Sequence, residues 1–143
     1  MSDDPFAPLT RLLIETLAPD LHPTGRFIDL MHHDIRFSFP YAPTGFPKLI
    51  TDREALSDYL ATLEGLLCVR KVSLKSSVIN GARTQAVLEF SATSALLQGG
   101  RLYAQDYVSI LTLKEGRILD YRDYWNPLKV LDAFEPEVKD DQI

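Results

Sequence analysis

The sequence predicts an α+β domain in which helices pack on one face of a curved antiparallel sheet. Two observations predict this class. Apolar residues recur every three or four positions over residues 6–18 and 51–67, which is the spacing of helices that bury one face. From residue 69 the spacing changes to two, and glycine-containing turns separate four long segments of this kind. Helices early and antiparallel strands late are typical of an α+β domain.

The first two helices are short. One is predicted over residues 6–18 and ends at Pro19. The next is expected to begin at Thr24 as its N-cap and to end at His32 and His33. Polar or cationic side chains at a helix end stabilise its free carbonyl groups. The alternative is that one histidine, His32, reaches a pocket and pairs with Asp123 as a proton relay.

The third helix has the clearest signal. A first strand is expected at residues 34–40, and residues 40–50, which are rich in Pro and Gly, are predicted as an irregular loop. Thr51 and Glu54 then form the pattern of a capping box. The apolar stripe that follows consists of Leu56, Tyr59, Leu60, Leu63 and Leu67.

The second half of the chain predicts an antiparallel meander. The turns INGAR, LQGG and KEGR each contain glycine and are short enough for hairpins. After the last strand, Asn126 and Pro127 predict the start of a short helix, since an N-cap asparagine precedes a proline at the first helical position. The expected strands are residues 69–79, 84–97, 102–113 and 117–125.

The last strand carries one carboxylate on an otherwise apolar and aromatic face. Strand side chains alternate between two faces, so Asp123 shares its face with Tyr121 and Trp125. Burial among such residues raises the pKa of an acid, and an acid poised nearer neutrality can exchange protons with a substrate. By the same alternation Leu119 also lies on this face, and the opposite face carries Ile118, Asp120, Arg122 and Tyr124.

Asp123 and Tyr107 are the candidate catalytic residues. The neighbouring strand brings Tyr107 and Ser109 to the same face as Asp123 if the hairpin has the expected register. The alternative is a structural Asp123 that accepts hydrogen bonds from tyrosine hydroxyls. Phe90 and Ala92 suit a cavity wall or an ordinary core. The candidate ligand-binding residues are Tyr121, Trp125, Ser109, Phe90, Phe39, Tyr41, Tyr59 and His32.

Composition excludes several classes of function. The chain has 143 residues, which predicts one domain over residues 1–143 with a core at about 6–134. Its net charge of −5 argues against a nucleic-acid partner. The single cysteine, Cys68, rules out an intrachain disulfide and a thiolate zinc site. No apolar run is long enough to span a membrane and no signal sequence is visible, so we expect a cytoplasmic protein.

Neither a cofactor nor a metal is expected. The chain has no glycine-rich phosphate loop, no nucleophile elbow and no dinucleotide fingerprint. His32 and His33 are adjacent, and on a helix two adjacent side chains point in different directions, which does not suit a shared metal ion.

The order of elements resembles the nuclear transport factor 2-like superfamily, in the branch of SnoaL-like polyketide cyclases and ketosteroid isomerases. The segments that carry the resemblance are FIDLMHHDIRFSFP, TDREALSDYL and DYVSILTLKEGRILDYRDYWNPL. The resemblance implies an α+β roll, in which a cone-shaped, mixed or antiparallel sheet wraps around the long third helix and encloses a mostly apolar pocket. It also implies that Asp123 stands where SnoaL-type cyclases and limonene epoxide hydrolase-type enzymes keep a catalytic Asp.

Several positions depart from these relatives. Phe39 stands where the resemblance places the general base of the isomerase, and Ser109 where it places the second Asp of the isomerase and the His of the cyclase. Phe90 and Ala92 stand where the epoxide hydrolases keep an Arg and an Asp. We therefore expect neither steroid isomerisation through the usual base nor epoxide hydrolysis through the usual set.

Two classes of function remain. The first is a cofactor-independent enzyme of the isomerase, cyclase or hydratase type, acting on a small apolar, polyketide-like or steroid-like molecule with Asp123 as general acid/base. The second is a non-catalytic module that binds a ligand in the same pocket or dimerises. The retained acid favours the first class, and the missing partner residues favour the second. A homodimer through the outer face of the sheet, around Asp120, Arg122 and Tyr124, is also expected.

Overall fold

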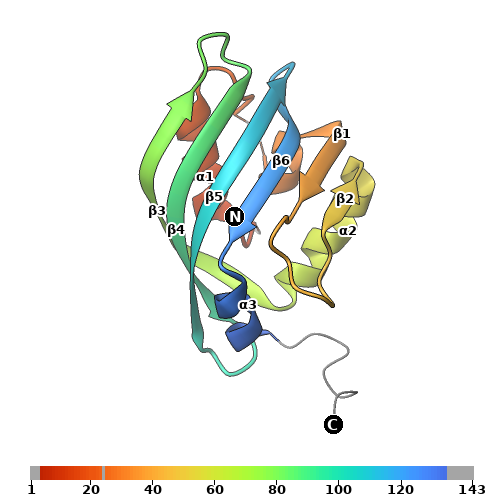
Figure 1. The fold of residues 1–143 in the computed structure, drawn as a ribbon, viewed down its shortest axis with the longest axis vertical. Helices are drawn as coiled ribbons and strands as arrows, with labels where there is room; N and C mark the ends of the chain where they lie inside the picture. Colours follow the sequence, from red (N-terminus) through yellow and green to blue (C-terminus); the bar gives the residue numbers. More distant parts are fainter. Residues whose placement is uncertain (1–3, 24, 135–143) are drawn as a thin grey trace.

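A computed structural model of the protein describes residues 4–23 and 25–134. Its six strands form one curved open sheet in the order β2-β1-β6-β5-β4-β3, with helices α1 and α2 behind it in Figure 1. All neighbouring strands are antiparallel except β1 and β6, which are parallel. The elements are α1 (Ala7–Leu17), the 3₁₀ helix η1 (Phe27–Leu30), β1 (Met31–Ser38), β2 (Leu49–Thr51), α2 (Arg53–Glu64), β3 (Leu67–Ile79), β4 (Gln85–Leu96), β5 (Leu102–Lys114), β6 (Arg117–Trp125) and α3 (Pro127–Ala133). The α+β class predicted from the sequence is confirmed.

The core lies between the helices and the inner face of the sheet. Leu13 and Leu17 of α1 are fully buried, as is Leu56 of α2, so both helices turn their apolar stripe toward the sheet. The inner residues of the late strands, such as Leu88 and Leu111, are also fully buried. None of the helices among the described residues is both long and apolar enough to cross a membrane.

The prediction of a helix that ends at the two histidines is wrong. Only Phe27–Leu30 forms a helical turn, and His32 and His33 lie at the start of β1. Met31 already pairs with Ile118 of the parallel strand β6, and this non-local pairing overrides the local helical spacing. The predicted cap, Thr24, lies outside the described residues.

The boundaries of α2 also differ from the prediction. Thr51 belongs to the short strand β2, so the expected loop ends at residue 48. The N-cap is Asp52, whose Oδ1 accepts a hydrogen bond from the backbone nitrogen of Ala55 at 2.8 Å. The capping-box pattern therefore misplaced the helix start by one residue. Leu67, predicted on the helical stripe, begins β3.

The late meander is confirmed, but the alternation along β6 is interrupted. Thr112 pairs with Asp120 and Leu113 with Ile118, which leaves Leu119 as an extra residue in a bulge. Ile118 is consequently fully buried, although strict alternation placed it on the outer face. Past the bulge the alternation holds, so Tyr121 and Asp123 point inward.

Candidate active site

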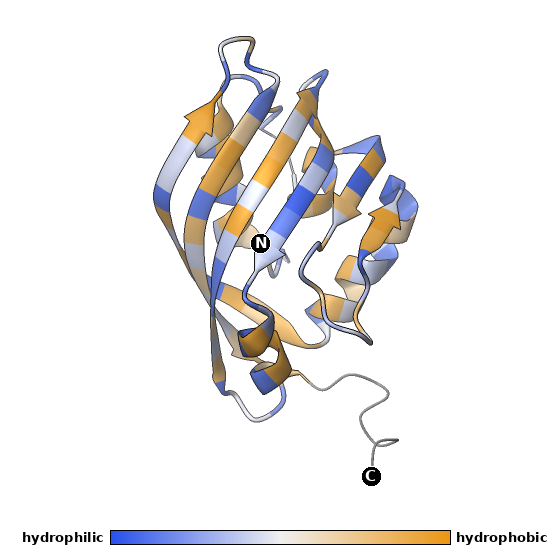
Figure 2. Ribbon diagram, viewed as in Figure 1, coloured by the Kyte–Doolittle hydropathy of each residue, from blue (hydrophilic) through white to orange (hydrophobic). Residues whose placement is uncertain are grey.

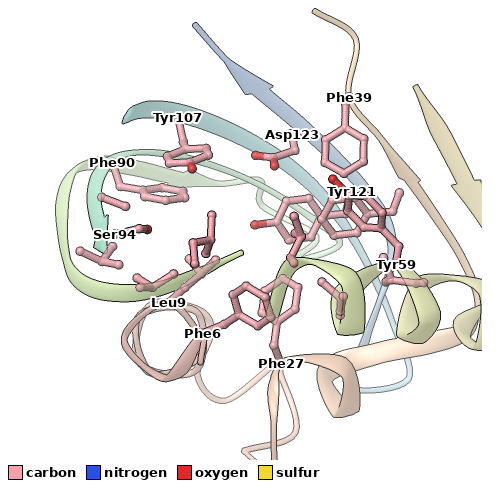
Figure 3. A pocket seen from close by; sticks show the side chains of 18 residues that line it. Phe6, Leu9, Phe27, Phe39, Tyr59, Phe90, Ser94, Tyr107, Tyr121 and Asp123 are labelled. Atoms are coloured by element: carbon pink, nitrogen blue, oxygen red, sulfur yellow. The ribbon is translucent and has the colours of Figure 1, made fainter. Parts of the chain in front are cut away.

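A cavity of about 100 Å³ lies between the inner face of the sheet and the helices. Figure 3 shows its side chains, which come from α1, η1, α2, β3, β4, β5 and β6 and from the end of β1. Its wall is mostly aliphatic and aromatic. The lining residues are Phe6, Leu9, Phe27, Phe37, Phe39, Leu56, Tyr59, Leu60, Leu63, Leu67, Val69, Val72, Phe90, Ala92, Ser94, Tyr107, Tyr121 and Asp123.

Six predicted site residues meet in this wall. Sheet register explains much of the arrangement, because Ser109 lies opposite Asp123 and Phe90 lies opposite Tyr107. The rings of Phe90 and Tyr107 stack with centroids 5.1 Å apart. The six residues are Asp123, Tyr107, Tyr121, Phe90, Phe39 and Tyr59.

One oxygen of the Asp123 carboxyl group is buried without a hydrogen-bond partner in the described part of the chain. Among the residues that the structure describes, its Oδ1 is the one buried side-chain oxygen or nitrogen that has no hydrogen-bond partner. Burial disfavours the charged form and raises the pKa of Asp123 to about 8. The protonated form of the side chain is therefore favoured at neutral pH.

Four tyrosines lie near enough to Asp123 for its charge to act on them. Burial, and after it the charge of Asp123, raises the pKa of Tyr59 to about 12. Burial likewise raises the pKa of Tyr103 to about 12, although a hydrogen bond from Gln105 opposes the rise. The pKa values of Tyr107 and Tyr121 are raised further, chiefly by burial. All four hydroxyls stay protonated at neutral pH and remain hydrogen-bond donors.

Tyr121 is held in place by its neighbours. Its ring stacks on Phe37 with centroids 4.2 Å apart. The Ser109 hydroxyl donates a hydrogen bond to the Tyr121 hydroxyl at 3.3 Å. Ser109 is fully buried and is not among the residues that line the cavity, and its hydroxyl contacts Tyr121 instead.

Trp125 and Tyr41 lie outside the cavity, contrary to prediction. Trp125 ends β6 and packs against Phe39 at 6.1 Å between ring centroids. Tyr41 follows Pro40 in a turn that leads the chain out of β1, and it is 58% exposed. It packs edge-on against Tyr124. Both residues border a second pocket, which shares Phe90 and Tyr107 with the cavity.

His32 also lies away from the cavity and from Asp123. It sits beside the β5–β6 turn, where its Nε2 is 3.6 Å from Oε1 of Glu115. Its position at the irregular start of β1 explains this, because the pairing with β6 shifts between Met31 and Arg36. The proton relay between His32 and Asp123 is therefore not formed.

The two histidines are not arranged as the helix prediction required. Their rings stack at 4.3 Å, and ligand atoms of His32, His33 and Asp34 lie within 4.8 Å of one another. However, Nδ1 of His32 accepts a hydrogen bond from the backbone nitrogen of Asp34 at 3.0 Å. The neutral ring then carries its proton on Nε2, so neither nitrogen of His32 offers a free lone pair to a metal.

The wall opposite Asp123 was not predicted. Phe6 and Leu9 come from the start of α1, and Phe27 comes from η1. Their apolar character was visible in the sequence as helical spacing. One sequence gives no signal that separates a residue facing a cavity from one facing a filled core, so these three residues could not be found.

No family model matches the chain, but related sequences and structures do. The chain is 33% identical over 106 residues to the uncharacterized protein YesE of Bacillus subtilis, covering 74% of this chain and 72% of that protein. It is 37% identical over 106 residues to an uncharacterized PhzA/B-like protein of Pseudomonas aeruginosa, covering 73% and 74% respectively.

Several solved structures are also similar to this chain. A crystal structure of a candidate isomerase from Bacillus subtilis is 32% identical, with a TM-score of 0.70 over 76% of this chain and 78% of that chain. A nuclear transport factor 2-like protein of unknown function from Burkholderia pseudomallei (12% identical, TM-score 0.61, 76% and 82% covered) shares the fold. So does a candidate SnoaL-like polyketide cyclase from Mesorhizobium loti (22% identical, TM-score 0.59, 87% and 99% covered).

The chain thus combines a curved sheet in an α+β fold with a mostly apolar cavity between that sheet and the helices. The chain belongs to the same family as YesE of Bacillus subtilis and the PhzA/B-like protein of Pseudomonas aeruginosa, and it has the fold of nuclear transport factor 2-like proteins.

Proposed function

We propose that the protein is a cofactor-independent enzyme of the isomerase, cyclase or hydratase type that acts on a small, largely apolar molecule. Asp123 is its general acid/base. One observation carries the proposal, namely a carboxyl group in a cavity wall with a buried Oδ1 that no described residue hydrogen-bonds.

An unpartnered buried carboxyl group is costly for a protein. Buried polar atoms almost always have hydrogen-bond partners, and leaving one without a partner costs about 1–3 kcal/mol. A purely structural aspartate at this position would gain by accepting a hydrogen bond from one of the tyrosines around it. The lack of a hydrogen-bond partner for Oδ1 of Asp123 is better explained if a ligand that enters the cavity supplies that hydrogen bond.

The protonated state of Asp123 sets the order of the chemistry. With a pKa of about 8, the carboxyl group holds its proton at neutral pH and first donates it to a substrate oxygen. The resulting carboxylate then takes a proton from a substrate carbon or from water, which regenerates the acid. Tyr107, whose hydroxyl stays protonated, donates a second hydrogen bond to the same substrate oxygen and helps to polarise the carbonyl group.

The named relatives are consistent with small-molecule chemistry. The Bacillus subtilis structure that is 32% identical to this chain is described as a candidate isomerase. Other neighbours are candidate polyketide cyclases and a phenazine biosynthesis-related protein from Pseudomonas aeruginosa. We therefore expect a substrate with an apolar body and an oxygen that can be protonated.

Proton exchange at carbon tests this proposal without knowledge of the natural substrate. Small cyclic ketones and lactones are incubated with the protein in D₂O, and loss of the α-proton signals is followed by NMR. The wild type is expected to accelerate exchange over buffer, and Asp123→Asn is expected to lose the acceleration. Asp106→Asn, which changes an exposed carboxylate on the outer face, is the matched control. Equal rates for wild type and Asp123→Asn would reject the proposal.

The alternative function is a non-catalytic ligand-binding module of the same fold. Phe39 and Ser109 support it, because the resemblance places acidic or basic groups at these positions in the enzymes, whereas here Phe39 lines the cavity and Ser109 binds Tyr121. A ligand that binds the wild type tightly and exchanges no proton at any pH would favour this alternative.

We also propose a homodimer through the outer face of the sheet. In Figure 1 no helix covers the middle of this face, and Figure 2 shows apolar and polar residues alternating along its strands. Val87 lies opposite Ile110, and Val108 lies opposite Tyr124, so apolar side chains of three strands adjoin there. Asp120 and Arg122 flank them. A monomer mass in light scattering at micromolar concentration would reject the dimer. The cytoplasmic location stays a prediction.

A further inference from the structure

We propose that the cavity selects neutral molecules about the size of one six-membered ring that carry a single hydrogen-bond acceptor at one end, and rejects carboxylates of the same size. A small cyclic ketone or lactone has this chemistry. The inference rests on the proposed function only in taking this cavity as the substrate site.

The charge of the wall excludes anions. The 18 lining residues include one acid, Asp123, and no lysine, arginine or histidine. A carboxylate brought into this cavity would lose its water without gaining a cation, which costs several kcal/mol. It would also repel Asp123 whenever that group is ionised.

The polar atoms of the wall gather on one side. In Figure 3, Asp123, Tyr107, Tyr59 and Tyr121 surround one part of the cavity, and Phe6, Leu9 and Phe27 lie across from them. Ser94, on β4 beside Phe90, is the remaining polar lining residue. A ligand that satisfies this wall has one polar end toward Asp123 and an apolar body toward α1.

The polar side offers donors. Asp123 and its neighbouring tyrosines keep their protons at neutral pH, because burial raises the pKa of each. Each then presents an O–H group, and the matching ligand atom is an acceptor such as a carbonyl oxygen.

The volume limits the body of the ligand. A cavity of about 100 Å³ is smaller than the roughly 300–1,000 Å³ of common drug-sized pockets. A dry cavity of about 150 Å³ holds one benzene molecule. The cavity of this protein is smaller than that, so a single ring is the upper limit, and a fused pair of rings does not fit unless the walls move.

Four probe molecules test separately how the charge, the polarity and the size of a ligand affect its binding. Cyclohexanone carries the acceptor, methylenecyclohexane has the same shape without it, cyclohexanecarboxylate is anionic, and 1-decalone has a second ring. Binding to the full chain is measured by NMR titration of tyrosine side-chain signals. We expect cyclohexanone to bind about tenfold more tightly than methylenecyclohexane, as one hydrogen bond of average strength allows. The carboxylate should bind at least a hundredfold more weakly than cyclohexanone, about the effect of one buried unpaired charge.

Two variants and one control variant test whether the probes bind in this cavity and whether Asp123 causes the preference for the ketone. Asp123→Leu should remove the preference for the ketone over methylenecyclohexane. Ala92→Leu fills the cavity from β4 and keeps Asp123 and the tyrosines, and it should abolish binding of all the probes. Thr93→Leu adds similar bulk on the outer face of the same strand and should leave binding unchanged.

Each remaining result overturns the inference. Equal affinity for ketone and carboxylate contradicts the charge argument, equal affinity for ketone and methylenecyclohexane contradicts the donor argument, and tight binding of 1-decalone contradicts the size argument. If none of the four probes binds, the whole inference is rejected.

Proton exchange distinguishes this inference from the proposed function. Exchange without charge selectivity in binding rejects this inference alone, and selectivity without exchange rejects only the proposed function.

Discussion

Two aspartates on the same β5–β6 hairpin differ in every respect that matters for chemistry. Asp106 points outward and is exposed, with Lys129 at 3.3 Å and Lys75 at 3.6 Å, and the hydrogen bond and charge of Lys129 chiefly lower its pKa. Asp123 points inward, has no partner for Oδ1, and has a pKa raised to about 8 by burial. The face of the strand decides whether a carboxylate is a surface ion or a proton donor.

The largest predicted effect is the difference in exchange activity between substitution of Asp123 on the inner face of the sheet and substitution of Asp106 on the outer face. Asp123→Asn removes the proton that is transferred, so exchange in the ketone assay should fall by about a hundredfold or more, the usual contribution of a general acid/base. Asp106→Asn should leave the rate unchanged. A similar loss in both variants would show that folding, rather than proton transfer, had been damaged.

A smaller loss of activity is expected for the hydroxyl that assists Asp123. Tyr107→Phe keeps the stacked ring beside Phe90 and removes only the donor. We expect the exchange rate to fall about ten- to a hundredfold, with the melting temperature nearly unchanged. A full rate in Tyr107→Phe would assign this tyrosine to packing alone.

The two faces should also differ in how stability depends on pH. The pKa of Asp123 is raised in the folded state from 3.8 to about 8, so the folded state holds a proton that the unfolded state releases. Stability from this group is complete below about pH 4 and is lost as the pH rises to about 8. Denaturant unfolding between these values should therefore give a falling free energy of unfolding, with a slope of up to about 1.4 kcal/mol per pH unit.

Substitution of Asp123 provides the control for this pH effect. Asp123→Asn cannot ionise, so it should flatten the falling curve and should be more stable than the wild type above about pH 7. Asp106→Asn should keep the falling curve. A wild-type stability that rises from pH 4 to pH 8 would mean that Asp123 is ionised and partnered in the folded protein.

The smallest predicted effect belongs to Ser109. Ser109→Ala removes the hydrogen bond to Tyr121 but leaves a residue of nearly the same size in a fully buried position. We expect about 1 kcal/mol of lost stability in denaturant unfolding and less than a tenfold change in exchange rate. A loss of activity as large as that of Asp123→Asn would show that Ser109 acts in the reaction itself.

The sequence predicted what depends on neighbours along the chain. The late hairpins were predicted because each turn carries glycine, and in the β5–β6 turn Gly116 adopts a positive φ of 77°. The inward direction of Asp123 was predicted from alternation, since the bulge at Leu119 lies before it.

What depends on distant segments was not predicted. The parallel pairing of β1 with β6 makes a strand of His32 and His33, and no local pattern encodes that pairing. Trp125 follows the alternation of β6 and still leaves the cavity, because the strand ends there against Phe39. Phe6 and Leu9 line the cavity because α1 packs against the sheet, which only the assembled fold determines.

The most direct test is the pKa of Asp123, measured from the carboxyl carbon chemical shift during a pH titration, with and without cyclohexanone. We predict a pKa near 8 that shifts upward when the ketone binds, because the carbonyl oxygen accepts a hydrogen bond from the protonated form only. A pKa at or below 3.8 that no ligand changes would contradict the account and make Asp123 a partnered structural carboxylate.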